Sequence, residues 1–274
     1  MRGGKCVSNL VAGAAIILAI VGATVCLENL SLTQVEKQKL EQLKQAISSI
    51  NFPIHRMKEE LNLVRYLRAR RWDVPGAKDM LLQTVKWWKD NNMDEIHTED
   101  WSSVAKEYPI NTDGVDRNGQ PVFVFSIGDW DLRRAALQGK LDLAIRHFIK
   151  GFDEVHVKSI EYNKSGKSNG TQWNFISNLD KLSRQQHLCI PCLRFYTGIM
   201  LMFESHYPGS TEKIFVINAP SIFSVILTLV QPILSPETYK ALQILGTNKE
   251  QWGPILFSHI AKDQLPESVG GSRT

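Results

Sequence analysis

Apolar residues recur every three or four positions along residues 31–105, which is the spacing of amphipathic helices. The first predicted helix begins at a capping box, in which Ser31 is followed three residues later by Gln34. Its inward stripe consists of aliphatic side chains and ends before Pro53. The stripe residues are Leu40, Leu43, Ile47 and Ile50.

Two further helices are predicted in the same region. One runs from about Lys58 to Arg71 with its apolar residues on one side. The other begins after Asp73, a favourable N-cap residue, has Pro75 in its first turn, and runs to about Asp90. The spacing therefore predicts a helical bundle over residues 31–105.

From Asp113 onward the pattern changes to strands that alternate with helices. Two turn dipeptides, Asp113-Gly114 and Asn118-Gly119, precede a β-rich run from Pro121 to Ile127. Further strands are predicted at 171–179 and 212–219, and helices at 141–162 and 185–206. This order predicts an α/β lobe over residues 106–274, with a mostly parallel sheet covered by helices.

An apolar segment of helical length runs from Pro220 to Leu234. Its apolar residues surround the helix axis and leave no polar stripe: Ile222, Phe223, Val225, Ile226, Leu227, Leu229 and Val230. A helix that is apolar all round is covered on both sides, by protein or by a bound apolar ligand. The pattern alone leaves both a buried core helix and a ligand-covering helix open.

A second apolar run, Val7 to Leu27, follows Arg2 and Lys5 and contains no charged residue. About twenty residues suffice to span a hydrocarbon core of ~30 Å, whereas Ala23 and the residues before it resemble a signal-peptidase site. Residues 1–30 are thus interpreted as a signal-anchor, a cleaved signal, or a buried or disordered tail. We expect membrane association or entry into the secretory pathway, and a cytoplasmic location where the segment is not inserted.

Composition fits one compact domain of ordinary globular character with extensions. Of the 274 residues, 43% are hydrophobic and 22% are charged. The net charge of +4 is too small to indicate nucleic-acid binding. No histidine pair has metal-ligand spacing and no Gly-x-Ser-x-Gly elbow is present, so we expect a non-catalytic protein without cofactor. We also expect a monomer.

Cys189-Ile190-Pro191-Cys192 has the Cys-x-Pro-Cys form of thiol oxidoreductases, and a helix is predicted to continue beyond it. A thiol oxidoreductase that uses Cys189 and Cys192 is therefore one alternative function. The other interpretations are two small apolar residues at a helix start, or a local disulfide in a lumenal domain.

Several separate motifs occur between about residues 35 and 271. The first is an arginine-rich helix followed by an Asp-Val turn. The motifs are Leu63 to Val74, His206-Tyr207-Pro208-Gly209, Lys213 to Pro220, Ile244-Leu245-Gly246, and Leu265 to Gly271. In order and spacing they resemble the Sec14-like (CRAL-TRIO) lipid-transfer family.

This resemblance implies a domain that holds one hydrophobic lipid in an internal pocket and transfers or presents it at a membrane surface. It implies that the segment from Pro220 to Leu234 is a mobile gate, with Phe223, Ile226, Leu227, Val230 and Ile233 as gate residues. Candidate pocket residues are Phe175, Phe215 and Ile217. A membrane-tethered lipid sensor that acts through a protein partner is the alternative.

Three polar positions that bind an inositol phosphate head in the family bear on the ligand. Arg70 matches the family's arginine, but Gln231 stands where the family has lysine, and Gly209 where it has an acidic residue. Trp173 and Phe175 fall where fungal relatives have small hydroxyl residues that touch choline. The resemblance thus implies a phospholipid or, in a more apolar pocket, a sterol-like, tocopherol-like or retinoid-like ligand.

Overall fold

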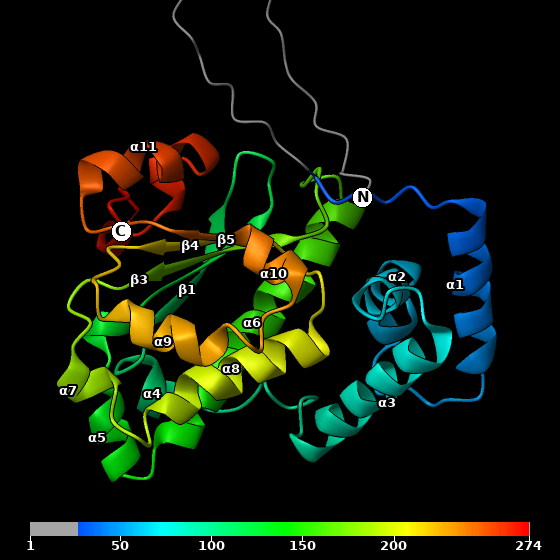
Figure 1. Cartoon of the computed structure of the whole chain (residues 1–274), viewed down its shortest axis with the longest axis horizontal. Coiled ribbons are helices and arrows are strands. Elements are labelled where there is room, and N and C mark those ends of the chain that lie inside the picture. Colours follow the sequence, from blue (N-terminus) through cyan, green and yellow to red (C-terminus); the bar gives the residue numbers. More distant parts are fainter. Residues whose placement is uncertain (1–26, 274) are drawn as a thin grey trace, which may run out of the picture.

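A computed structural model describes residues 27–273, which form a helical bundle beside an α/β lobe (Figure 1). The predicted signal or anchor segment, Val7 to Leu27, lies outside the described residues except for Leu27. Within 27–273, no helix is both long enough and apolar enough to cross a bilayer.

The bundle follows the helices predicted from spacing. It consists of α1 (Gln34–Ala46), the 3-10 turn η1 (His55–Lys58), α2 (Glu60–Ala69) and α3 (Val74–Asp90), and α4 (Ser102–Ala105) follows it. Asp73 caps α3 as predicted, because its side chain accepts a hydrogen bond from Gly76 N. The capping box of α1 is instead formed by Thr33 and Glu36. The prediction of Ser31 and Gln34 began this helix too early, since two hydroxyl residues precede the same apolar stripe.

The lobe is built on a five-stranded sheet in the order β1-β2-β3-β4-β5. The strands are β1 (Ile110–Val115), β2 (Pro121–Ser126), β3 (Trp173–Asn178), β4 (Thr211–Ile217) and β5 (Leu242–Ile244). β1 pairs antiparallel with β2, and the other pairs are parallel. The mostly parallel sheet is confirmed, although β1 and β5 lie outside the predicted strands.

Helices cover both faces of this sheet (Figure 1). One face is covered by α6 (Leu141–Lys164), α8 (Leu193–His206) and α9 (Phe223–Val230), and the other by α11 (Lys249–His259). Shorter elements connect them: η2 (Ile127–Asp129), α5 (Leu132–Leu137), α7 (Arg184–His187), α10 (Pro236–Ala241), η3 (Lys262–Gln264) and η4 (Glu267–Val269).

Two predicted helices are shorter in the structure. The helix predicted at 185–206 is split into α7 and α8 by a loop that Cys189 and Cys192 close with a disulfide. Pro191 in this loop lacks a backbone N–H and disfavours helical geometry in the residue before it. The apolar segment from Pro220 to Leu234 contains a helix only at α9, which ends before Pro232.

Candidate functional site

A cavity lies between the sheet and helices α6, α8 and α9. Its atom-free space is about 880 Å³, counted with its mouth. Most of its wall is aromatic or aliphatic. The lining residues are Phe125, Ile127, Phe148, Phe152, Trp173, Phe175, Ser177, Leu179, Phe195, Tyr196, Ile199, Met200, Phe203, Thr211, Ile214, Val216, Phe223, Ile226, Leu227, Val230, Leu234, Thr238 and Leu242.

The floor of the cavity comes from alternate residues of the central strands. Phe175 on β3 lies on the cavity side, where its ring stacks on Phe123 with centroids 5.4 Å apart. On β4 the cavity residues are Thr211, Ile214 and Val216. Side chains of a strand point to opposite faces in turn, so Ile214 and Val216 reach the same side. Thr211 departs from this alternation, because the register of β3 and β4 shifts next to its partner Trp173.

Phe215 and Ile217 do not line this cavity, contrary to the prediction. They lie on the opposite face of the sheet in a cluster with Leu256 of α11. A strand of a parallel sheet is buried on both faces and reads as a continuous apolar run. Residues 214–217 are all apolar, so hydrophobicity does not indicate which alternate set faces the cavity.

The predicted gate residues fall mostly on the cavity side of α9. Phe223, Ile226, Leu227 and Val230 line the cavity, whereas Ile233 is absent from its wall. The outer face of α9 carries polar residues that the prediction of an all-apolar helix overlooked. Among them are Ser224 and Thr228, both exposed, with Thr228 Oγ1 donating to Ser224 O at 2.8 Å.

Aromatic residues on α6 and α8 form a large part of the wall and were not predicted as site residues. Phe148 and Phe152 lie four residues apart on α6, and Phe195, Ile199 and Phe203 repeat at the same interval on α8. Such spacing places side chains on one helix face. This four-residue spacing is present in the sequence, but every helix that faces a hydrophobic core shows it, so it does not identify a cavity.

The wall of the cavity carries few polar groups. Among its lining residues, all of which the structure describes, none is ionisable at neutral pH. Three buried polar atoms in it have no hydrogen-bond partner within residues 27–273: Trp173 Nε1, Tyr196 Oη and Thr211 Oγ1. Trp173 and Thr211 are paired across β3 and β4. Burial raises the pKa of Tyr196, so its hydroxyl stays protonated and able to donate.

The candidate head-group residues lie outside the cavity wall. Arg70 is exposed at the end of α2, and Gln231 is exposed at the end of α9. Gly209 has a φ of 64°, and a Cβ added there would lie 3.5 Å from Cγ of Arg65. The structure therefore does not bring Arg70 or Gln231 to the cavity.

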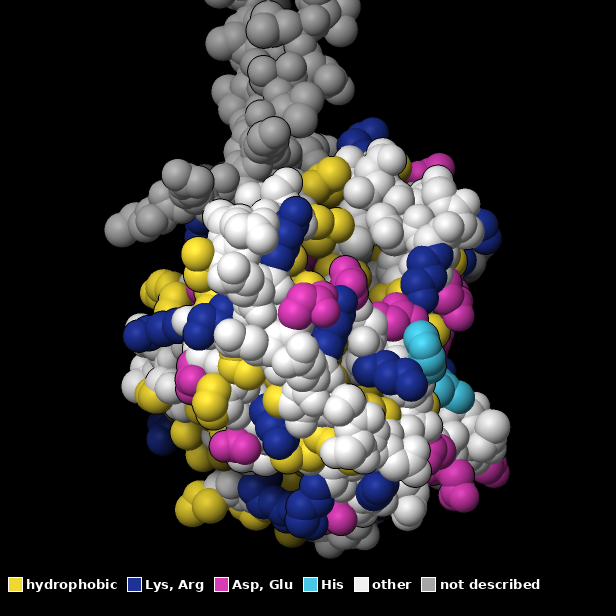
Figure 2. Space-filling model, turned by 90° about the vertical axis from the view of Figure 1, so that its right-hand side faces the viewer, with side chains coloured by type: hydrophobic (Ala, Val, Ile, Leu, Met, Phe, Trp, Pro, Cys, Tyr) yellow, Lys and Arg dark blue, Asp and Glu magenta, His cyan; other side chains and the backbone are white. Residues whose placement is uncertain are grey.

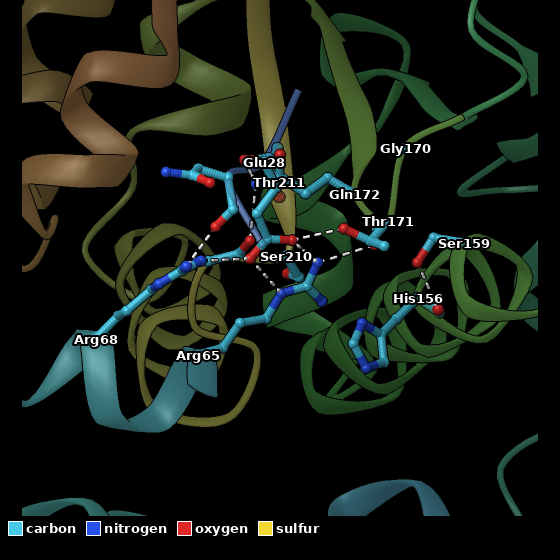
Figure 3. A network of polar contacts seen from close by, with 12 residues as sticks. Glu28, Arg65, Arg68, His156, Ser159, Gly170, Thr171, Gln172, Ser210 and Thr211 are labelled. Carbon is cyan, nitrogen blue, oxygen red and sulfur yellow. Dashed lines mark hydrogen bonds and ion pairs between the residues drawn. The ribbon is translucent and has the colours of Figure 1, made fainter. Parts of the chain in front are cut away.

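A buried ionic cluster joins the bundle to the lobe close to Gly209 (Figure 3). Glu28 Oε2 accepts from Arg65 Nη2 and from Thr171 Oγ1, both at 2.6 Å, and Glu28 Oε1 accepts from Arg68 Nη1 at 3.2 Å. Arg65 also donates to the carbonyl oxygen of Thr171 at 2.9 Å. Sequence reasoning missed this cluster, because Arg65 and Thr171 are 106 residues apart.

A second polar junction lies between the same two parts of the molecule. Asp153 on α6 is buried, bonded to Arg56 of η1, 2.8 Å from His97 Nε2, and accepts from Tyr207 Oη at 3.0 Å. Burial opposes ionisation of Asp153, but the His97 hydrogen bond and the Arg56 charge outweigh it and lower its pKa. The two clusters fix the bundle against the lobe.

Two family models and several known proteins match most of this chain. A family model described as the CRAL/TRIO domain matches residues 105–271, and one described as the CRAL/TRIO N-terminal domain matches residues 39–83. A CRAL-TRIO domain-containing protein of Caenorhabditis elegans, T23G5.2, is 27% identical over 244 residues. These residues are 88% of this chain and 33% of the relative, so the chain spans about a third of that protein.

Two other matches cover most of the chain. The phosphatidylinositol/phosphatidylcholine transfer protein SFH12 of Arabidopsis thaliana is 27% identical over 225 residues, which are 77% of this chain and 39% of that protein. The crystal structure of Sfh5 superposes with a TM-score of 0.64 at 16% identity, covering 81% of this chain and 83% of that one. This likeness confirms the fold. Since the CRAL/TRIO domain model alone matches more than half of its residues, the chain belongs to the CRAL/TRIO domain family.

Proposed function

We propose that the protein binds one neutral hydrophobic lipid in the cavity of its lobe and transfers or presents it at membranes, with α9 as the gate. The observation that carries this proposal is the wall itself, which is mostly apolar and contains no side chain that is charged at neutral pH among the described lining residues. The Arabidopsis relative, named for transfer of phosphatidylinositol and phosphatidylcholine, supports lipid transfer in general.

Covering the ligand is a physical requirement of such transfer. Each methylene removed from water is worth ~0.8 kcal/mol, so a lipid of some twenty-five carbons would face a barrier of roughly 20 kcal/mol if it crossed water uncovered. The cavity is enclosed by apolar side chains of the sheet and of helices α6, α8 and α9. The apolar wall therefore shields the lipid from water during transfer.

The polar atoms of the wall favour a neutral ligand with a hydroxyl or carbonyl group. A charge buried without a partner costs far more than a polar group, and no lining side chain supplies a counter-charge. Trp173 Nε1, Tyr196 Oη and Thr211 Oγ1 are buried without partners, at a cost of about 1–3 kcal/mol for each buried polar group left unpaired. A sterol-like, tocopherol-like or retinoid-like molecule could satisfy one or more of them.

The proposed lipid contacts combine predicted and newly placed residues. Phe175, Phe223, Ile226, Leu227 and Val230 remain lipid-contacting residues, because all five line the cavity. On β4 we assign this role to Ile214 and Val216. No headgroup role is assigned to Arg70 or Gln231.

Native mass spectrometry of the purified full chain, followed by lipid extraction, tests the proposal. We expect one bound neutral lipid that carries a hydroxyl or carbonyl group. A protein that purifies well folded but takes up no lipid from mixed vesicles would contradict the proposed function. Uptake of phospholipid alone would contradict the proposed ligand class while leaving lipid binding intact.

A further inference from the structure

The two most exposed large apolar side chains among the described residues lie at the same end of the lobe. Ile190, in the loop between α7 and α8, is 87% exposed, and Leu137, at the end of α5, is 77% exposed. α5 packs against α7, and Ile190 follows α7 by only three residues. This end appears at the lower left of Figure 1.

The loop that carries Ile190 is held in its outward conformation. The disulfide between Cys189 and Cys192 closes the loop, and Cys192 is fully buried. Leu188 and Cys189 pack against the core of the lobe, which leaves Ile190 and Pro191 as the exposed tip. A cross-linked loop with a proline loses little conformational entropy when it binds, because few conformations are open to it beforehand.

Positive charge accompanies these apolar side chains. Arg133 on α5 and Arg184 on α7 are exposed, and neither lies within 4.0 Å of an acidic group in the part of the chain that the structure describes. Arg134 and Arg194 in the same region are paired with Glu107 and Asp142. Figure 2 shows the opposite side of the molecule, that of the bundle, where Lys and Arg side chains are interspersed with acidic and hydrophobic ones.

We propose that this end of the lobe is a docking surface for an anionic lipid bilayer. The docking surface consists of Arg133, Leu137, Arg184, Ile190 and Pro191. Apolar side chains that enter the boundary between head groups and acyl chains, flanked by cations that meet anionic head groups, are the two attractions that hold proteins at such interfaces.

The docking surface is placed to bring the gate to the bilayer. α8 begins at Leu193, directly after the disulfide loop, and packs along α9. Docking would therefore hold α9 close to the membrane surface. The proposed function supplies the reason for docking at a membrane. The docking surface itself is tested separately, because membrane association and lipid binding are different measurements.

The experiment uses the full chain and two kinds of vesicle, pure phosphatidylcholine and equal parts phosphatidylcholine and phosphatidylserine. Ile190→Asp and Leu137→Asp are expected to lower flotation with the anionic vesicles about tenfold each, because an apolar contact is lost and an acid is added. Val35→Asp is the matched control, since Val35 on α1 is 64% exposed but lies in the bundle. Equal losses in all three variants would overturn the proposal.

Charge is tested in the same assay. Arg133→Gln/Arg184→Gln is expected to weaken flotation with anionic vesicles and leave the weak binding to phosphatidylcholine unchanged. Lys37→Gln/Lys89→Gln removes two exposed cations from the bundle and is the control. Equal effects of the two double variants would show a general charge effect and contradict a defined surface.

A local probe excludes attachment to vesicles through the apolar N-terminal segment. An environment-sensitive fluorophore is attached to Leu137→Cys or to Val35→Cys, each in a chain with Cys6→Ser and Cys26→Ser. Anionic vesicles should shift the emission of the Leu137 probe to the blue and leave the Val35 probe unchanged. No shift at Leu137 would overturn the docking surface, whereas lipid retained in solution by the same variant would leave the proposed function standing.

Discussion

Removing the carboxylate of Glu28 should destabilise the protein strongly, although this residue lies outside every helix and strand. Glu28 is 8% exposed and pairs with Arg65, whose side chain is 2% exposed. Glu28→Ala leaves the Arg65 guanidinium buried without its counter-ion. Breaking a buried ion pair from one side costs about 3–5 kcal/mol, because the remaining charge stays desolvated.

The structure places the expected loss at the lower end of this range. Arg65 keeps one partner in Glu28→Ala, since its Nη2 also donates to the carbonyl oxygen of Thr171. We therefore expect about 3 kcal/mol of lost unfolding free energy, which for a chain of this size corresponds to a fall in Tm of roughly 6–12 °C. Glu28→Gln should lose less, because its amide oxygen still accepts one hydrogen bond.

Urea unfolding followed by circular dichroism measures this effect, and Glu60→Ala is the control. Glu60 also pairs with a cation, Lys44, but its side chain is 69% exposed. Exposed pairs contribute at most about 1 kcal/mol, since water and salt screen them. If Glu28→Ala and Glu60→Ala lower the unfolding free energy equally, the argument from burial is refuted.

Three further predictions concern the cavity and the sheet. Leu227→Asp should slow lipid transfer between vesicles at least tenfold, because it places a charge in the cavity wall, whereas Val225→Asp on the exposed face of α9 should not. Tyr196→Phe should weaken retention of a hydroxyl-bearing lipid several-fold in a competition assay, with Tyr239→Phe on the exposed surface as control. Burial and then the charge of Asp116 raise the pKa of Glu212 to about 7 from 4.5. Ionisation of Glu212 therefore destabilises the fold increasingly as the pH rises from 4.5 to 7, and fully above pH 7. Glu212→Gln should raise the urea midpoint at pH 8, and this advantage should shrink as the pH falls from 7 to 4.5 and be absent below 4.5.

Local rules of the sequence predicted those parts of the fold that depend on neighbouring residues. The N-cap of α3 follows from Asp73 and Pro75, and the helices of the bundle follow from the spacing of their apolar stripes. The alternation of strands and helices predicted the mostly parallel sheet. These features need no knowledge of distant contacts, because turn and helix signals act within a few residues.

The same local rules could not predict features that depend on residues far apart in the sequence. Phe215 was assigned to the wrong face of β4, since only the positions of α9 and α11 decide which face holds the cavity. The pairing of Glu28 with Arg65 and Thr171 joins three segments far apart in sequence. Aromatic residues such as Phe148 and Phe203 read as ordinary core, because a cavity wall and a filled core require the same apolar spacing.

The shortness of helix α9, the proposed gate, affects when the protein can exchange its bound lipid. α9 is only 8 residues long and lies between Pro220 and Pro232, neither of which can continue a helix hydrogen-bond ladder, so we expect the helix to move as a unit when the proposed gate opens. Opening in water would expose Ile226 and Val230, now buried, at roughly 1.5–3 kcal/mol each. The open fraction in solution is then about one in a hundred to one in ten thousand. Against acyl chains this penalty vanishes, so under the proposed function we expect little loss of lipid in water and exchange only at a membrane.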